Sequence, residues 1–206
     1  MAGDSVRRFG MDDRPGVLLL HPWWGVTAAV VEWAESLAEA GRRVLVPDLY
    51  GGKIATTVEE AEAARDGMDT ESALRLIGAC ADELAAAERP WTAMGFSLGA
   101  FFACSLAGRG QAGPDELILF YGGAPPRGEG TRTRVVHLHV APGDEYFTEE
   151  EIAETENGFR AAGAEVRTYR YHAGHWFAER DSPAFDAAAF ALARTRVLDR
   201  LRAWLP

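Results

Sequence analysis

Short apolar runs alternate with helical patterns along almost the whole of this 206-residue chain, and this alternation restricts its fold more than any other feature. The runs have the length and composition of strands buried on both faces. Between them, apolar residues recur at three- and four-residue steps, as they do in helices. The expected strands cover residues 16–21, 43–47, 91–94, 117–121, 135–140 and 166–171, the last at an edge. The expected helices cover residues 27–40, 58–65, 72–88, 97–106, 148–163 and 183–204.

Strands that alternate with helices form a parallel sheet covered on both faces. We therefore expect a single domain over residues 1–206, an α/β fold with three α/β/α layers and a mostly parallel sheet. In such sheets ligands bind at the carboxyl ends of the strands. The residues that follow expected strands are Trp23, Trp24, Asp48 to Tyr50, Ser97, Gly122, Asp144 and His175.

Charge and composition exclude several classes of partner. The chain has 21 basic and 31 acidic residues, a formal net charge of −10, and no block of Lys or Arg, which argues against nucleic acid and anionic membranes. The first ten residues carry charges and no apolar leader, and no run of eighteen apolar residues occurs, so we expect a cytoplasmic protein. Cys80 and Cys104 lie in Ala/Leu-rich helical patterns and are expected to be buried apolar residues.

The segment from residue 91 to 106 is typical of a strand, a sharp turn and an apolar helix. Its turn, Gly95-Phe96-Ser97-Leu98-Gly99, is a G-x-S-x-G pattern in the context that positions a nucleophilic serine. A serine on such a strained turn leaves no room for side chains two positions before and after it. The helix begins at the serine, so free N–H groups point toward its oxygen. The alternative is an ordinary serine in a tight turn.

A serine hydroxyl needs a base to accept its proton, so a histidine must lie within hydrogen-bond reach. His175 lies in a loop after the last expected strand, where such a base is needed. His21 lies inside a strand end, and His172 is still close to the edge strand. His137 and His139 form an H-x-H pair, for which core packing is the favoured interpretation because no third metal ligand is in view.

An acid must hold the imidazole in the correct tautomer. Asp144 directly follows the strand that ends at Val140, and the order Ser, Asp, His is the order of an α/β-hydrolase triad. Glu145 is the competing acid, whereas Asp48 is expected to be structural.

The oxyanion of an acyl-transfer intermediate needs two backbone N–H donors. Leu98 follows the nucleophile and supplies one of them. The second comes from the loop after the first strand, where Pro22 has no N–H and Trp23 is the natural donor.

With these residues in place, the chain resembles the dienelactone hydrolase family of α/β-hydrolases from Gly16 onward. The segments that carry the resemblance are His21-Pro22-Trp23-Trp24-Gly25-Val26, Val46-Pro47-Asp48-Leu49-Tyr50, Gly95-Phe96-Ser97-Leu98-Gly99, Phe120-Tyr121-Gly122, Gly143-Asp144 and Ala173-Gly174-His175-Trp176-Phe177-Ala178. The resemblance implies a triad of Ser97, Asp144 and His175, with Trp23 and Leu98 as oxyanion donors. The expected pocket residues are Trp24, Tyr50, Tyr121, Trp176 and Arg180.

The chain departs from this family at four places. Members that open dienelactones carry Cys at the position of Ser97 and Glu at the position of Pro22, where the Glu controls the thiol. They also bind the substrate carboxylate with an Arg at the position of Glu179, which is followed here by Arg180. Only about fifteen residues precede the first clear strand, so the usual N-terminal strand pair is shortened.

The segment between Tyr121 and Arg134 is too short for a helical cap, so we expect an open, shallow site. The first hypothesis is a serine hydrolase that cleaves small to medium esters or lactones through an acyl-enzyme, without metal or organic cofactor. A dienelactone hydrolase acting on an anionic lactone is the alternative, with Arg180 or Arg65 binding the carboxylate. The second alternative is a non-catalytic binding protein. The expected partner is a small molecule, and the chain is expected to be a monomer or a homodimer.

Overall fold

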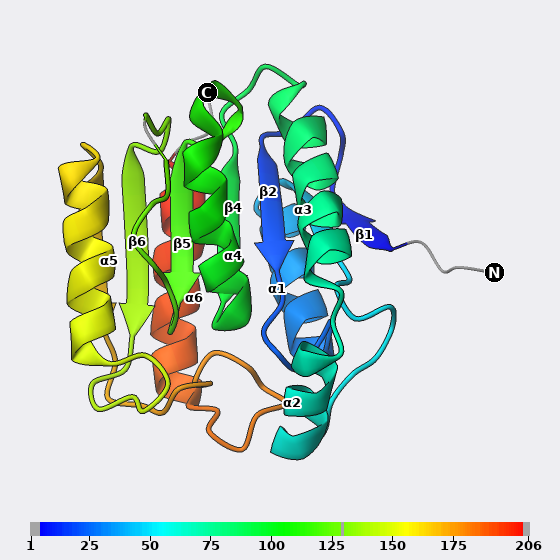
Figure 1. The fold of residues 1–206 in the computed structure, drawn as a ribbon, viewed down its shortest axis with the longest axis vertical. Coiled ribbons are helices and arrows are strands. Elements are labelled where there is room, and N and C mark those ends of the chain that lie inside the picture. The colour runs from blue at the N-terminus through cyan, green and yellow to red at the C-terminus, as the bar shows by residue number, and fades with distance from the viewer. Residues whose placement is uncertain (1–4, 129, 204–206) are drawn as a thin grey trace.

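The computed structural model describes residues 5–128 and 130–203. Its centre is a seven-stranded sheet with the order β1-β3-β2-β4-β5-β6-β7 (Figure 1). Neighbouring strands run parallel except β1, which is antiparallel to β3. The strands are β1 (Val6–Phe9), β2 (Gly16–Leu20), β3 (Arg43–Pro47), β4 (Thr92–Phe96), β5 (Glu116–Phe120), β6 (Val135–Val140) and β7 (Glu165–Arg170).

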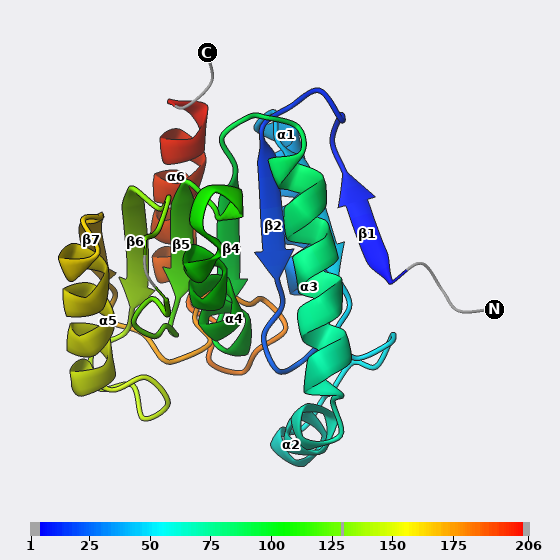
Figure 2. The same cartoon turned by 45° about the horizontal axis from the view of Figure 1, so that its top comes forward.

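Helices cover both faces of this sheet. They are α1 (Ala28–Glu39), α2 (Val58–Asp66), α3 (Thr70–Ala85), α4 (Leu98–Leu106), α5 (Glu149–Ala161) and α6 (Ala187–Arg202), and a 3₁₀ turn (Ala107–Ala112) follows α4. Figures 1 and 2 show α3, α4 and α5 on one face and α1 and α6 on the other. The predicted three-layer architecture is therefore confirmed. No helix among the described residues is long and apolar enough to cross a membrane.

β1 lies before Gly16, where the sequence shows no clear strand and predicts only a shortened N-terminal strand pair. It has four residues, and only Val6 of them is fully buried, while Arg7 and Arg8 are exposed. A pattern this short and this polar does not stand out from a charged terminus. The strand forms because β3 offers it a free edge, with Val6 opposite Pro47.

Helix boundaries follow local capping. Thr148 forms the predicted N-cap of α5, in a capping box with Glu151. The last helix begins at residue 187, later than the sequence suggests, because the Asp186 carboxylate accepts from the N–H groups of Ala188 and Ala189. Residues 171–186 therefore form a long loop at the carboxyl ends of the strands, drawn in orange in Figures 1 and 2.

A cluster of buried aromatic side chains connects this loop to the core. Trp33 of α1 packs against Phe96, Phe120 and Phe190, which come from β4, β5 and α6. Its indole N–H donates to the backbone oxygen of Ala178 over 3.1 Å. The loop that carries His175 is thus anchored to the same aromatic cluster that holds β4 and β5 together.

The start of α4 packs closely against the end of β2. A Cβ on Gly99 would overlap the backbone carbonyl groups of Leu20 and His21, and one on Gly95 would overlap the backbone of Gly99 and Ala100. The structure therefore leaves no room for a side chain at either glycine of the turn, as the sequence pattern predicts. The obstructing atoms are backbone atoms of α4 and of the end of β2, which cannot move away as a flexible side chain can.

We expect Gly99→Ala to lower the free energy of unfolding by about 1–3 kcal/mol or more, because the added methyl group overlaps backbone. Gly78→Ala is the matched control, since Gly78 lies inside α3 and its added Cβ meets nothing closer than an Arg109 nitrogen at 3.6 Å. That variant is expected to gain up to about 1 kcal/mol from helix propensity. Urea denaturation of both variants checks this, and equal stabilities would contradict it.

Candidate active site

Ser97 occupies the sharp turn between β4 and α4. Its backbone has φ 50° and ψ −112°, a conformation that L-residues rarely adopt. The turn is held by a hydrogen bond from the Ser97 N–H to the carbonyl oxygen of Phe120, at 2.9 Å. Strain maintained in this way at a single polar residue is typical of functional sites. The side chain is partly exposed, so small molecules can reach it.

The structure brings Ser97, His175 and Asp144 together. The Ser97 hydroxyl lies 2.9 Å from Nε2 of His175, and Nδ1 of His175 lies 2.6 Å from Oδ2 of Asp144. The side chains of His175 and Asp144 are 5% and 1% exposed. Asp144 comes from the loop after β6 and His175 from the loop after β7, so three strand ends meet here.

The Asp144 carboxylate is fixed from both sides. Its Oδ1 accepts from the N–H groups of Tyr146 and Phe147, at 2.8 and 3.2 Å, which leaves Oδ2 for His175. An ionised carboxylate on Nδ1 favours the tautomer that carries its proton there, so the Nε2 lone pair faces Ser97. Glu145, the competing acid, is exposed, and Asp144 is the acid that contacts the imidazole.

The two backbone N–H groups expected to bind an oxyanion are those of Trp23 and Leu98. Trp23 lies in a turn closed by the hydrogen bond from Gly25 N–H to Pro22 O, and Leu98 is the first residue of α4. Within the described part of the chain, neither of these two N–H groups donates to a protein acceptor. Both are therefore free to bind a developing negative charge, and the Leu98 N–H also lies at the positive end of the helix dipole.

The other histidines have structural surroundings. His21 links two strand ends, with Nδ1 2.6 Å from Pro22 O and Nε2 accepting from the Leu49 N–H, and burial lowers its pKa. His139 contacts the Tyr171 hydroxyl, and burial lowers its pKa well below the usual range. His137 lies 3.0 Å from the carboxylate of Glu116.

No group of three or more His, Cys, Asp or Glu in the described ranges could hold a metal ion. Both histidines of the H-x-H pair lie in β6 and are buried. Cys80 and Cys104 are both buried free thiols, as expected from their apolar surroundings.

Four aromatic side chains, those of Trp23, Trp24, Tyr146 and Trp176, pack together beside His175 and form an aromatic wall. Trp23 stacks on Trp176 at 5.8 Å between ring centroids, and Trp24 packs edge-on against both. Tyr146 completes the wall, at 5.0 Å from the His175 ring and 6.0 Å from Trp23. Tyr146 was missed in the sequence, although its place two residues after Asp144 was the available signal. It is 54% exposed, so it borders the entrance to the site.

Tyr50 and Tyr121 are both buried. Tyr50 packs edge-on against His21, and burial raises the pKa of its hydroxyl to about 12. The Tyr121 ring lies 4.9 Å from that of His175, and its hydroxyl donates to Oε1 of Glu179 over 2.6 Å. The Tyr121 backbone has φ 36°, a second strained position next to Ser97. Tyr121 is thus a buried support beneath His175.

Glu179 is a buried acid at the position where the resemblance implies an Arg. Burial, together with the charge of Asp181, raises the pKa of Glu179 to about 8, although the hydrogen bond from Tyr121 acts in the opposite direction. The carboxyl is therefore mostly protonated at neutral pH. A neutral acid here offers one acceptor to Tyr121 and one O–H donor.

Arg180 does not line the site, contrary to the expectation from the sequence. Its Nε bonds the Glu32 carboxylate of α1 at 2.8 Å, and its guanidinium lies over Phe185 and Phe190. The side chain is exposed and points away because an acid and two aromatic faces attract it there. Arg65 is closer to the site, with its guanidinium 5.9 Å from the centre of the Trp23 ring.

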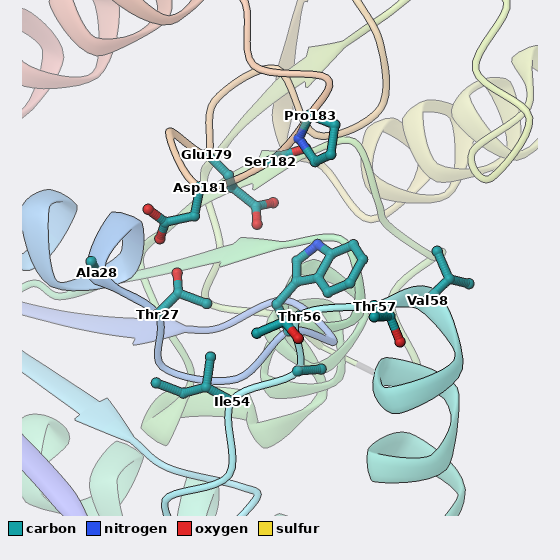
Figure 3. Close-up of a pocket in the computed structure, with 12 residues that line it drawn as sticks. Thr27, Ala28, Ile54, Thr56, Thr57, Val58, Glu179, Asp181, Ser182 and Pro183 are labelled. Carbon is teal, nitrogen blue, oxygen red and sulfur yellow. The ribbon is translucent and has the colours of Figure 1, made fainter.

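A pocket of about 510 Å³ lies beside the aromatic wall. Figure 3 shows Glu179 and Asp181 on one side and Thr27 and Ile54 on the other. Its lining residues are Trp24, Thr27, Ala28, Ile54, Ala55, Thr56, Thr57, Val58, Glu179, Asp181, Ser182 and Pro183. Ser97 is not among them, so the pocket adjoins the three candidate residues and does not contain them.

The fold and the site define an α/β-hydrolase, and comparison with known proteins gives the family. The model of the dienelactone hydrolase family matches residues 7–205. Carboxymethylenebutenolidase 1 of Cupriavidus pinatubonensis is 30% identical over 207 aligned positions, covering 92% of this chain and 86% of that protein. This chain belongs to the dienelactone hydrolase family, a family of hydrolases, as the sequence resemblance indicated.

Solved structures share the fold at low identity. A dienelactone hydrolase-like promiscuous phosphotriesterase from metagenomic libraries has a TM-score of 0.77 at 20% identity, over 96% of this chain and 97% of that one. A protein from Klebsiella pneumoniae has a TM-score of 0.76 at 16% identity, over 93% of this chain and 88% of that one. Esterase 2 of Thermogutta terrifontis has a TM-score of 0.70 at 13% identity, over 95% and 88%.

The raised pKa of Glu179 makes a prediction about stability. Between the usual value of 4.5 and about 8, the folded protein keeps a proton that the unfolded chain releases, so rising pH favours unfolding. Relative to Glu179→Gln, the wild type is expected to lose free energy of unfolding as pH rises from about 5 to about 8. The loss is of the order of 1 kcal/mol per pH unit.

Urea denaturation at several pH values measures this difference. Gln is nearly isosteric with protonated Glu and keeps the acceptor for Tyr121. Glu145→Gln, which removes an exposed carboxyl one residue from Asp144, is the control for the loss of an acid. Parallel stability curves for wild type and Glu179→Gln would show that Glu179 is ionised at neutral pH.

Proposed function

We propose that this protein is a serine hydrolase that cleaves carboxylic esters or lactones of small to medium size through an acyl-enzyme. The observation that carries the proposal is the chain of contacts from Ser97 through His175 to Asp144, at 2.9 and 2.6 Å. Membership of a hydrolase family supports it.

The geometry suits each step of acyl transfer. Nε2 of His175 accepts the Ser97 proton as Oγ bonds to the ester carbonyl carbon. The bond to the alcohol then breaks, and His175 protonates the departing oxygen. Water attacks the acyl-enzyme in the same way, with His175 again as the base, and the carboxylic acid leaves. Asp144 stabilises the imidazolium that forms twice in this cycle.

The tetrahedral intermediates carry negative charge on the former carbonyl oxygen. We assign its binding to the backbone N–H groups of Leu98 and Trp23, which have no other acceptor among the described residues. Donors held in place before the reaction need no reorganisation when the charge develops, and removing one such donor commonly costs about 10²–10³ in rate. Water is the second substrate, and no step requires a metal or an organic cofactor.

The size of the substrate follows from the loop after β5. The described residues from Tyr121 to Arg134 contain no helix, and Ser97 stays partly exposed, which favours an open site. A lactone with a carboxylate is the second candidate substrate, suggested by the name of the 30% identical relative. Glu179 and the outward Arg180 disfavour it, so Arg65 would have to bind that carboxylate.

The proposal predicts the rates of four proteins with p-nitrophenyl acetate and butyrate. Ser97→Ala is expected to lose about three orders of magnitude or more in kcat, because no other group can form the acyl-enzyme. Asp144→Asn is also expected to lose orders of magnitude, since an amide does not enforce the required tautomer. Glu145→Gln, at the exposed neighbouring acid, is the matched control and should keep wild-type rates.

Initial rates from released p-nitrophenolate give the result. Equally slow turnover by wild type and Ser97→Ala would contradict the proposal and favour a non-catalytic binding protein. A loss of kcat in Glu145→Gln, with none in Asp144→Asn, would overturn the assignment of Asp144 as the acid that acts on His175.

A further inference from the structure

Thr27 has an unusual hydrogen-bonding situation at the start of α1. It is the N-cap residue, yet its side chain makes no capping bond. The Ala29 N–H that such a side chain commonly binds donates instead to Oδ2 of Asp181, at 2.8 Å. The Thr27 hydroxyl therefore has no protein partner among the described residues, although the residue is only 6% exposed. A buried hydroxyl left in this state costs stability unless something binds it.

The Thr27 hydroxyl belongs to the pocket beside the aromatic wall. Figure 3 shows it on the side of the pocket opposite Glu179 and Asp181, with its oxygen toward them. The indole N–H of Trp24, which also lines this pocket, is buried and has no acceptor. Two unpartnered polar groups, three residues apart in the segment between β2 and α1, thus line one cavity.

The rest of the lining sets the kind of ligand. Ile54, Val58 and Pro183 make the walls largely apolar, and Ile54 and Val58 remain exposed at the rim. The acidic side chains among the described lining residues are Glu179, which is mostly protonated near pH 7, and Asp181. A carboxylate bound in the pocket would meet the like charge of Asp181, with no described basic side chain in the lining to offset it.

The pocket and the proposed catalytic residues share neighbours. Trp24 packs against Trp176, whose ring lies 5.1 Å from that of His175. On the other side, Glu179 bonds Tyr121, whose ring also lies against His175. Trp24 directly follows Trp23, the proposed oxyanion donor, so one substrate extending from Ser97 along the wall would enter the pocket.

We propose that this pocket binds the non-reacting end of the substrate and selects an uncharged, mainly apolar group that ends in a hydrogen-bond-accepting oxygen. The Thr27 hydroxyl and the Trp24 indole N–H donate to that oxygen. Binding in the pocket does not depend on the proposed hydrolase function. Only the reaction of the other end of the same molecule at Ser97 rests on that function.

Binding is tested with ¹⁵N-labelled Ser97→Ala protein, titrated with dimethyl succinate and with monomethyl succinate. The indole N–H signal of Trp24, assigned with Trp24→Phe, should move with dimethyl succinate, and the anionic monoester should bind more weakly. Adding Thr27→Val should weaken binding of the diester about three- to tenfold, the worth of one neutral hydrogen bond. Thr70→Val, at an exposed threonine that begins α3, is the matched control. An unmoved Trp24 signal, or equal affinity for both compounds, would overturn the proposal.

Catalysis is tested with two p-nitrophenyl esters of equal chain length, the methyl succinate and the hexanoate. The ratio of kcat/KM for the methyl succinate to kcat/KM for the hexanoate should be about three- to tenfold lower in Thr27→Val than in wild type and in Thr70→Val. An unchanged ratio would overturn the link between the pocket and Ser97. If the wild type does not hydrolyse even p-nitrophenyl acetate, the proposed function fails, while the titration still decides whether the pocket binds such a group.

Discussion

The close contact between the start of α4 and the end of strand β2 determines the conformation of this site. Because Gly99 packs directly on the carbonyl groups of Leu20 and His21, the chain must turn sharply after β4. That turn forces Ser97 to φ 50° and places it at the carboxyl edge of the sheet. The first N–H groups of α4 then face the same side as the serine hydroxyl. Backbone packing therefore sets the conformation of Ser97, independently of His175 and Asp144.

A second set of contacts holds the histidine. Asp144 fixes the imidazole from one side, while Tyr121 lies against its ring and is bonded to the buried Glu179. Burial keeps Glu179 mostly neutral near pH 7, so it serves as an uncharged partner for Tyr121 and as part of the neighbouring pocket. In this chain an acid replaces the Arg that the family resemblance implies, and the polarity of the pocket changes with it. Glu179 thus takes part both in supporting the imidazole of His175, through Tyr121, and in setting the substrate preference of the pocket.

Much of this arrangement could be predicted from the sequence, because buried strands and the G-x-S-x-G turn leave strong local patterns. The topology of a parallel sheet then places the residues after β4, β6 and β7 at one edge, which is why Asp144 and His175 could be chosen. The direction of Arg180 could not be predicted, since it depends on Glu32 and on two aromatic rings of distant segments. The unpartnered hydroxyl of Thr27 could likewise not be predicted from the sequence, because Asp181 from another loop caps α1 in its place. β1 forms only because a neighbouring edge is available.

The central claim is that Ser97 forms a covalent acyl-enzyme, and covalent labelling tests it most directly. The protein would be treated with a fluorophosphonate, which transfers its phosphonyl group to an activated serine oxygen with loss of fluoride. Intact mass spectrometry and peptide mapping should show one adduct per chain, on the peptide that contains Ser97, with much slower labelling of His175→Ala. An unlabelled wild-type protein, or an adduct on a different residue, would contradict the account.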